Sequence, residues 1–163
     1  MKTMRQRLAQ VFQVPADLDY VEAFQVLSKI NLEIRRYGPT AERLIRKAHL
    51  ERDVGNHASS LVAAQDALVL DPRNPEMHYH VGLAFLYLAL AKADALPVGP
   101  SPSELPEDQP KALLEKAVAA FRLVLELNPR DEDALLDADT LQAVLDAHPD
   151  DRRLGEALRS RKV

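Results

Sequence analysis

Apolar residues recur at a spacing of three to four along most of the chain, in segments separated by Gly, Pro, Asn and Asp. This spacing places apolar side chains on one face of an α-helix, whereas a half-buried strand would alternate every second residue. The pattern therefore predicts an all-α protein in which each helix buries one face against its neighbours.

Turn-forming and capping residues mark the boundaries of the predicted helices. Thr40, Asn74 and Asp131 can cap a helix, and each directly precedes a helical segment. Pro75 and Pro110 suit the first helical position, because the N–H that proline lacks is unpaired there anyway. The segments expected to be helical are 17–36, 41–52, 57–70, 75–95, 110–127 and 132–147, followed by a short helix that contains Leu154 and Leu158.

The connections between these helices are short, except for a proline-rich insert at about 96–110. Short connections make consecutive helices antiparallel neighbours. Proline at this density cannot continue a helix, so the insert is expected to be extended and exposed. A recognition element and a solvated spacer are both open interpretations of the insert.

One helix ending occurs twice. The stretch AAQDALVLDPRN at 63–74 returns as AFRLVLELNPRD at 120–131, with the same stop of a polar residue, Pro, Arg and then Asn or Asp. A repeated helix ending indicates a repeated structural unit, and repeats determine the architecture of a chain.

The repeat resembles the tetratricopeptide repeat (TPR), a helix–turn–helix unit of about 34 residues. In the clearest unit, eight residues stand at the family's Trp, Leu, Gly, Tyr, Ala, Phe, Ala and Pro positions. They are, in that order, His78, Val81, Gly82, Phe85, Ala117, Phe121, Val124 and Pro129. The separation between Pro72 and Pro129 exceeds one period, and the excess coincides with the proline-rich insert.

The resemblance implies a superhelical stack of antiparallel helix pairs, with about two and a half repeats. The TPR-like domain is expected at 41–163, and 1–40 forms an N-terminal helical extension. Small residues at Gly82 and Ala117 would let two helices approach closely, and Phe121 would fill the space between hairpins. The residues expected to pack one layer on the next are Pro72, Gly82, Phe85, Ala117, Phe121 and Pro129.

In such a stack, the first helix of each pair lines the concave side. The resemblance places on that side Ile45, His49, Arg52, Tyr79, Leu83, Leu86, Tyr87, Leu136, Thr140 and Ala143. A groove that is apolar in its middle and polar at its edges is typical of a partner-binding surface. We therefore expect a non-catalytic interaction module, an adaptor or chaperone-like scaffold, that binds a peptide or helix of another protein. The alternative is that the N-terminal helix or the insert covers these residues.

Chaperone-binding members of the TPR family hold a C-terminal carboxylate with Lys and Asn side chains. The matching positions here are Ile45, His49, His80, Asp133 and Asp137. Two carboxylates among them would repel a carboxylate ligand, so the sequence argues against this type of clamp.

Charge is unevenly distributed, although the formal net charge is only −4. Residues 1–52 and 152–163 are basic, and residues 53–151 are strongly acidic. An acidic middle repels phosphate backbones, which argues against nucleic acid as a partner. Basic ends and an acidic body also support a second hypothesis, a structural protein that self-associates into homo-oligomers. Solvated helix faces with an uneven charge are the simpler explanation.

No arrangement of residues predicts catalysis, a cofactor or a metal site. The sequence has no cysteine, and none of its five glycines belongs to a phosphate-binding loop motif. His78 and His80 are two apart on a helix and point in different directions, whereas a metal needs three or four ligands. His57 and Ser60 lack an acid at a spacing that would orient them for nucleophilic catalysis. We expect the protein not to be an enzyme.

The absence of cysteine is compatible with a reducing compartment, and we expect a cytoplasmic protein. Residues 1–16 carry Lys2, Arg5 and Arg7, and their apolar runs are too short for a signal peptide. A docking N-terminal helix is the expected role of this stretch, and an organelle transit peptide is the alternative. No segment reaches membrane-spanning length, so membrane insertion is not expected.

Overall fold

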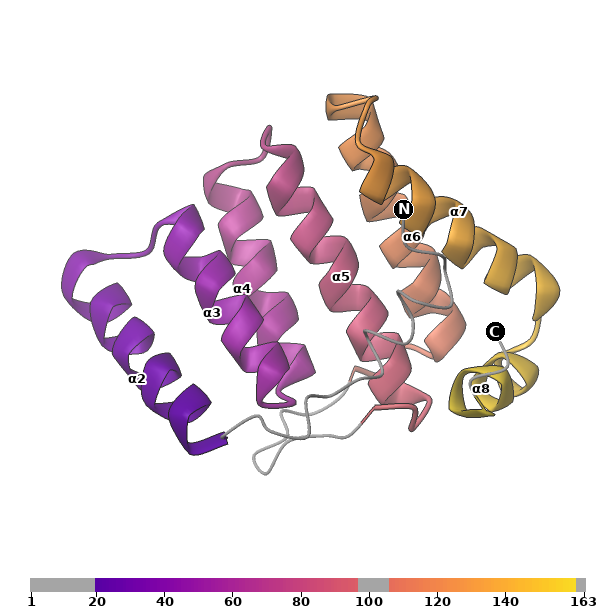
Figure 1. The fold of residues 1–163 in the computed structure, drawn as a ribbon, viewed down its shortest axis with the longest axis horizontal. Coiled ribbons are helices and arrows are strands. Elements are labelled where there is room, and N and C mark those ends of the chain that lie inside the picture. Colours follow the sequence, from indigo (N-terminus) through magenta and orange to yellow (C-terminus); the bar gives the residue numbers. More distant parts are fainter. Residues whose placement is uncertain (1–19, 97–105, 161–163) are drawn as a thin grey trace.

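The computed structural model describes residues 20–96 and 106–160, and these ranges contain seven α-helices and no strand. The helices are α2 (Tyr20–Tyr37), α3 (Ala41–Asp53), α4 (His57–Leu70), α5 (Pro75–Lys92), α6 (Pro110–Leu127), α7 (Glu132–Ala147) and α8 (Asp151–Ser160). They stack in chain order, with α2 at one end and α7 and α8 at the other (Figure 1). The predicted all-α stack of helix pairs is confirmed.

Two of the pairs are complete and the last is not. The α3–α4 and α5–α6 pairs pack along their lengths, and α4 and α6 also contact the next helix of the stack. The last pair is incomplete because α8 has only 10 residues and packs mainly on α6 rather than along α7. The stack therefore ends with α7 lacking a full-length partner helix.

Capping contacts explain why most helices begin where the sequence predicts. The Thr40 hydroxyl accepts a hydrogen bond from the backbone N–H of Arg43 at 3.2 Å. The side-chain oxygen of Asn74 accepts one from the backbone N–H of Glu76 at 3.0 Å, and Asp131 caps α7 in the same way. Each of these oxygens pairs with one of the N–H groups that the first helical turn leaves without a partner.

The end of α5 differs from the prediction, which extended this helix to residue 95. The helix stops at Lys92, because Asp94 adopts a left-handed backbone with a φ of 57°. The backbone N–H of Ala95 then bonds the carbonyl of Leu90 at 2.8 Å, and that of Asp94 bonds Ala91 at 3.1 Å. This pair of bonds is a Schellman motif, in which Asp occupies the position that glycine usually takes.

Some predictions lie outside the described residues. They are the start of the first helix at residue 17, the proposed roles of residues 1–16, and the extended form of the insert over 97–105. Residues 106–109 of the insert are described, and the carbonyl of Pro106 accepts a hydrogen bond from Lys92 Nζ at 3.0 Å.

The core is densest between α5 and α6, the two helices with the most extensive mutual contact. Phe121 on α6 is completely buried and lies against Gly82 on α5, where an added Cβ would come within 2.7 Å of the ring. Ala117 is also completely buried in this contact. The two small residues permit the close helix approach that the repeat pattern implies. Phe85 is half-buried against the same core.

The α3–α4 hairpin is held by buried polar contacts as well as by apolar packing. Ser60 is buried, and its hydroxyl donates a hydrogen bond to the carbonyl of Ala48 at 2.7 Å. The Asn56 side-chain amide donates to a carboxylate oxygen of Glu51 at 2.9 Å, and both residues are buried. These bonds offset part of the cost of removing polar groups from water.

Candidate partner-binding surface

Side chains of α3 and α5 meet on one side of the stack. The rings of His49 and His80 lie edge to face, with their centroids 4.7 Å apart. About one turn further along α3 and two turns further along α5, the Arg52 guanidinium lies over the Tyr87 ring, with Cζ 4.8 Å from the ring centroid. These contacts join first helices of successive pairs, which the resemblance places on a common concave side.

The same side continues from α5 to α7. The Tyr79 hydroxyl donates a hydrogen bond to Oδ2 of Asp137 at 2.8 Å. The Tyr79 ring lies 5.3 Å from the Phe121 ring, measured between centroids, so it is anchored in the core while its hydroxyl reaches the surface. We call the surface made by α3, α5 and α7 the inner face; it comprises His49, Arg52, Tyr79, His80, Leu83, Tyr87, Leu136, Asp137 and Thr140.

The two histidines of the inner face are neutral at physiological pH. Burial lowers the pKa of His80 to about 4, with smaller contributions from nearby His49 and Arg52. Burial also lowers the pKa of His49, and the Arg52 charge adds to this effect. Arg52 donates a hydrogen bond to Nδ1 of His49 at 3.3 Å, because a guanidinium is only a donor. The neutral His49 ring therefore carries its proton on Nε2.

An apolar pocket of about 450 Å³ opens between α2, α3 and the start of α5. It is lined by Val26, Ile30, Ile45, Arg46, His49, Leu50, Glu76 and His80. The Nδ1 atom of His80 is buried and has no hydrogen-bond partner among the described residues. The pocket thus combines apolar walls with the polar side chains of Arg46, His49, Glu76 and His80.

The contribution of α2 to this pocket was missed in the sequence. Val26 and Ile30 are four apart and lie on one side of α2, where they line the pocket beside Ile45. The only signal available was the apolar spacing of α2, which equally predicts packing against α3. Which neighbour an apolar helix face meets is decided by tertiary contacts.

Two residues predicted for the open groove are buried, and the expectation is corrected there: Leu86 does not line the pocket, and Ile45 is present only as one of its walls. Ile45 is 8% exposed and Leu86 is 7% exposed, and each belongs to the core. The physical reason for Leu86 is that α5 is apolar around its whole circumference, so periodicity does not separate its inner and outer sides. Leu83 and Tyr87 on α5 stay partly accessible, as do the positions predicted on α7, of which Ala143 is exposed.

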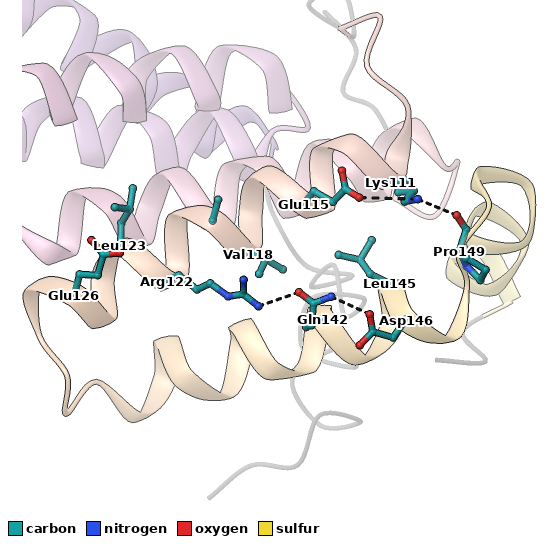
Figure 2. Close-up of a pocket in the computed structure, with 11 residues that line it drawn as sticks. Lys111, Glu115, Val118, Arg122, Leu123, Glu126, Gln142, Leu145, Asp146 and Pro149 are labelled. Atoms are coloured by element: carbon teal, nitrogen blue, oxygen red, sulfur yellow. Dashed lines mark hydrogen bonds and ion pairs between the residues drawn. The ribbon is translucent and has the colours of Figure 1, made fainter.

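A second depression, of about 820 Å³, lies between α6 and α7 (Figure 2). Val118 and Leu145 contribute buried apolar side chains to it. Arg122 donates to the Gln142 side-chain oxygen at 3.0 Å, and the Gln142 amide donates to Asp146 at 3.0 Å. This chain of bonds crosses from one helix to the other.

Lys111 lies with Pro149 at one end of this depression between α6 and α7 (Figure 2). Its Nζ donates to the carbonyl of Pro149 at 3.0 Å and lies 4.0 Å from a carboxylate oxygen of Glu115. Its backbone N–H donates to the Asp151 carboxylate at 3.0 Å. These polar groups satisfy one another, which is typical of a seam between helices and leaves the inner face as the better candidate site.

Residues 20–96 and 106–160 offer neither a metal site nor a membrane-spanning helix. In these ranges no three His, Asp or Glu side chains come together in a way that could hold a metal ion. No helix in the same ranges combines the length and the apolar content needed to cross a bilayer.

Comparison with known proteins gave no match, either among protein-family models or among curated proteins.

Proposed function

We propose that the chain is a non-catalytic, TPR-like protein-interaction scaffold, an adaptor or chaperone-like subunit, that holds a peptide or helix of another protein on its inner face. The observation that carries the proposal is the line of contacts across three helices. It passes from Arg52 through His49 and His80 on α3 and α5, and Tyr79 joins α5 to Asp137 on α7. The cysteine-free sequence favours a reducing compartment such as the cytoplasm.

The inner face has a polarity that indicates what it would hold. Arg52 supplies a fixed positive charge at the α3 side, next to histidines that stay neutral, and the carboxylates of Asp53 and Glu76 lie near the same groups. Asp133 and Asp137 lie on α7 at the other side, and α7 contains no Lys or Arg. A matching segment would place a basic side chain near α7 and an acidic one near Arg52. Phosphate backbones would be repelled at α7.

The pocket between α2, α3 and α5 supplies the apolar part of the recognition. Its volume of about 450 Å³ is enough for one large aliphatic or aromatic side chain of the bound segment. An apolar anchor in a pocket with polar groups around it is the usual source of binding energy at protein interfaces.

Capture of partners from a lysate of the source organism tests this proposal. Leu83→Asp places a charge in the middle of the inner face, and the control Val69→Asp places the same charge on α4, where Val69 is exposed. Retained proteins are quantified by mass spectrometry. We expect the unmodified protein and the control to retain the same set, and Leu83→Asp to lose it.

Leu83 is half-buried, so its substitution also needs a check on folding. Circular dichroism and thermal unfolding of each variant provide that check, and Thr140→Lys on α7 provides a second disruption of the inner face. Equal retention by the folded variants and the unmodified protein would overturn the proposal.

A further inference from the structure

The terminal helix α2 buries one side and exposes the other. Ala23, Leu27 and Ile30 are buried on the side that faces the rest of the stack. On the opposite side, Val21 is 64% exposed and Leu32 is 49% exposed. Capping helices of repeat stacks usually have a polar outer side, so two exposed aliphatic residues here are more than a cap requires.

The outer side of α2 is also basic. Lys29, Arg35 and Arg36 are exposed next to the two aliphatic residues, and none of them forms an ion pair with another described residue. Two acids lie on α2: the carboxylate of Glu33 lies 4.0 Å from Arg46 on α3, and Glu22 is exposed in the first turn, so the three basic residues leave this side with a positive balance. We call this surface the basic end; it comprises Val21, Lys29, Leu32, Arg35 and Arg36.

The other end of the stack has the opposite charge. On α7, exposed residues recur at three-to-four spacing and so share one side of the helix. They are Glu132, Leu135, Asp139 and Ala143, which we call the acidic end. Leu135 is 49% exposed, and α8 leaves this side uncovered because it packs mainly on α6.

The two ends match in length as well as in chemistry. α2 has 18 residues and α7 has 16, which correspond to rods of about 27 and 24 Å at the α-helical rise. Each rod offers aliphatic side chains flanked by charges, basic on α2 and acidic on α7. Packing α2 on a second α2, or α7 on a second α7, would bring like charges together, which favours the mixed contact.

We propose that copies of this chain associate head to tail, with the basic end of one copy packed on the acidic end of the next. The contact would bury Val21 and Leu32 against Leu135 and Ala143, and it would give α7 the neighbouring helix that the short α8 does not supply. A heterologous contact of this kind extends into open chains unless its rotation closes a ring. The proposal is independent of peptide binding, because the inner face stays open in such a chain.

Sedimentation velocity of the full chain tests the proposal with two charge-reversal variants. Lys29→Glu with Arg36→Glu makes the basic end acidic, and Glu132→Lys with Asp139→Lys makes the acidic end basic. The unmodified protein should form larger species as its concentration rises at low ionic strength, and salt should weaken them. Each variant alone should associate at least about tenfold more weakly than the unmodified protein, because its two ends then carry like charges.

The decisive measurement is an equimolar mixture of the two variants. Their reversed ends are again complementary, so the mixture should associate like the unmodified protein. The matched control, Arg73→Glu with Arg130→Glu, changes the same charge at exposed turn residues and should associate normally. A monomeric unmodified protein at low ionic strength, association that survives both reversals, or a mixture of folded variants that stays monomeric would each overturn the proposal.

Discussion

Gly82 and Phe121 are in such close contact that a Cβ on the glycine would lie 2.7 Å from Cε1 of the ring. Carbon atoms do not approach so closely without strain, and the ring is completely buried, so it has no free space to enter. This one pair therefore sets the separation of α5 and α6. Glycine is required here by the neighbouring helix, since its own backbone is ordinary α-helix.

Gly82→Ala should lower the free energy of unfolding by about 1–3 kcal/mol through overpacking. Alanine also has a higher helix propensity than glycine, by about 1 kcal/mol, and the expected loss is the net value after this gain is subtracted. Gly155→Ala on α8 is the matched control, because its Cβ would meet only Arg159 Nη1 at 3.6 Å, an ordinary contact. Urea titrations followed by circular dichroism should show opposite signs for the two variants; stabilisation by Gly82→Ala would refute the packing account.

Ser60→Ala should destabilise the fold by about 1 kcal/mol, because it removes a buried hydrogen bond between α4 and α3. Ser28→Ala is the comparison, since the Ser28 hydroxyl bonds the carbonyl of Phe24 within the same helix and is exposed. Its effect should stay within about 0.5 kcal/mol. The urea midpoints of the two variants distinguish the bond between helices from the bond within one helix. Equal losses of unfolding free energy in both variants would show that the bond between α4 and α3 contributes nothing of its own.

Tyr79→Phe should remove the bond to Asp137 while leaving the ring packed on Phe121. The expected loss is about 1–2 kcal/mol, as for a partly buried bond to a charged group. A double-mutant cycle with Asp137→Ala isolates the pair from the other interactions of each residue. A coupling energy close to zero would mean that this bond does not hold α7 against α5.

Acid should destabilise the fold through His80. Its pKa is about 4 in the folded chain and 6.5 for the unperturbed side chain, so below pH 6.5 the unfolded chain binds the proton more readily. The contribution of neutral His80 to the free energy of unfolding is therefore fully present above pH 6.5. It is lost as the pH drops toward 4, by about 2 kcal/mol after allowance for residual solvent contact.

Replacement of the His80 ring tests that pH dependence. His80→Leu should unfold with a smaller difference in free energy between pH 7 and pH 4.5 than the unmodified protein. In the unmodified protein, NMR titration of the His80 imidazole should show no protonation step near pH 6.5. An unchanged pH dependence in the variant would assign the acid sensitivity to other groups.

The sequence predicts helix starts well because a cap is a local device. Thr40, Asn74 and Asp131 are read from their own position and the few residues that follow. The end of α5 is less predictable, since Asp94 takes a left-handed conformation more typical of glycine. Local rules thus recover the architecture and fail where a residue is used in an uncommon way.

The candidate site was only partly predictable for a different reason. The repeat pattern indicates which helices face the inner side, and the contact between His49 and His80 agrees with it. It does not separate Leu86, which is buried, from Leu83, which is half-buried, because both lie on a helix that is apolar all round. The pocket wall made by Val26 depends on how α2 docks, which no local pattern encodes.

The seam between α6 and α7 has a mechanical consequence. Gln142 and Asp146 lie on the other side of α7 from Asp137, so the last layer is tied inside by Tyr79 and bridged outside by Arg122. A tilt of α7 that keeps the inner bond and moves Gln142 away from α6 stretches the outer bond to Arg122. A force that displaces α7 on the inner side of the molecule is therefore felt at the Arg122–Gln142 bond on the outer side, because the Tyr79 hydroxyl holds α7 at one point.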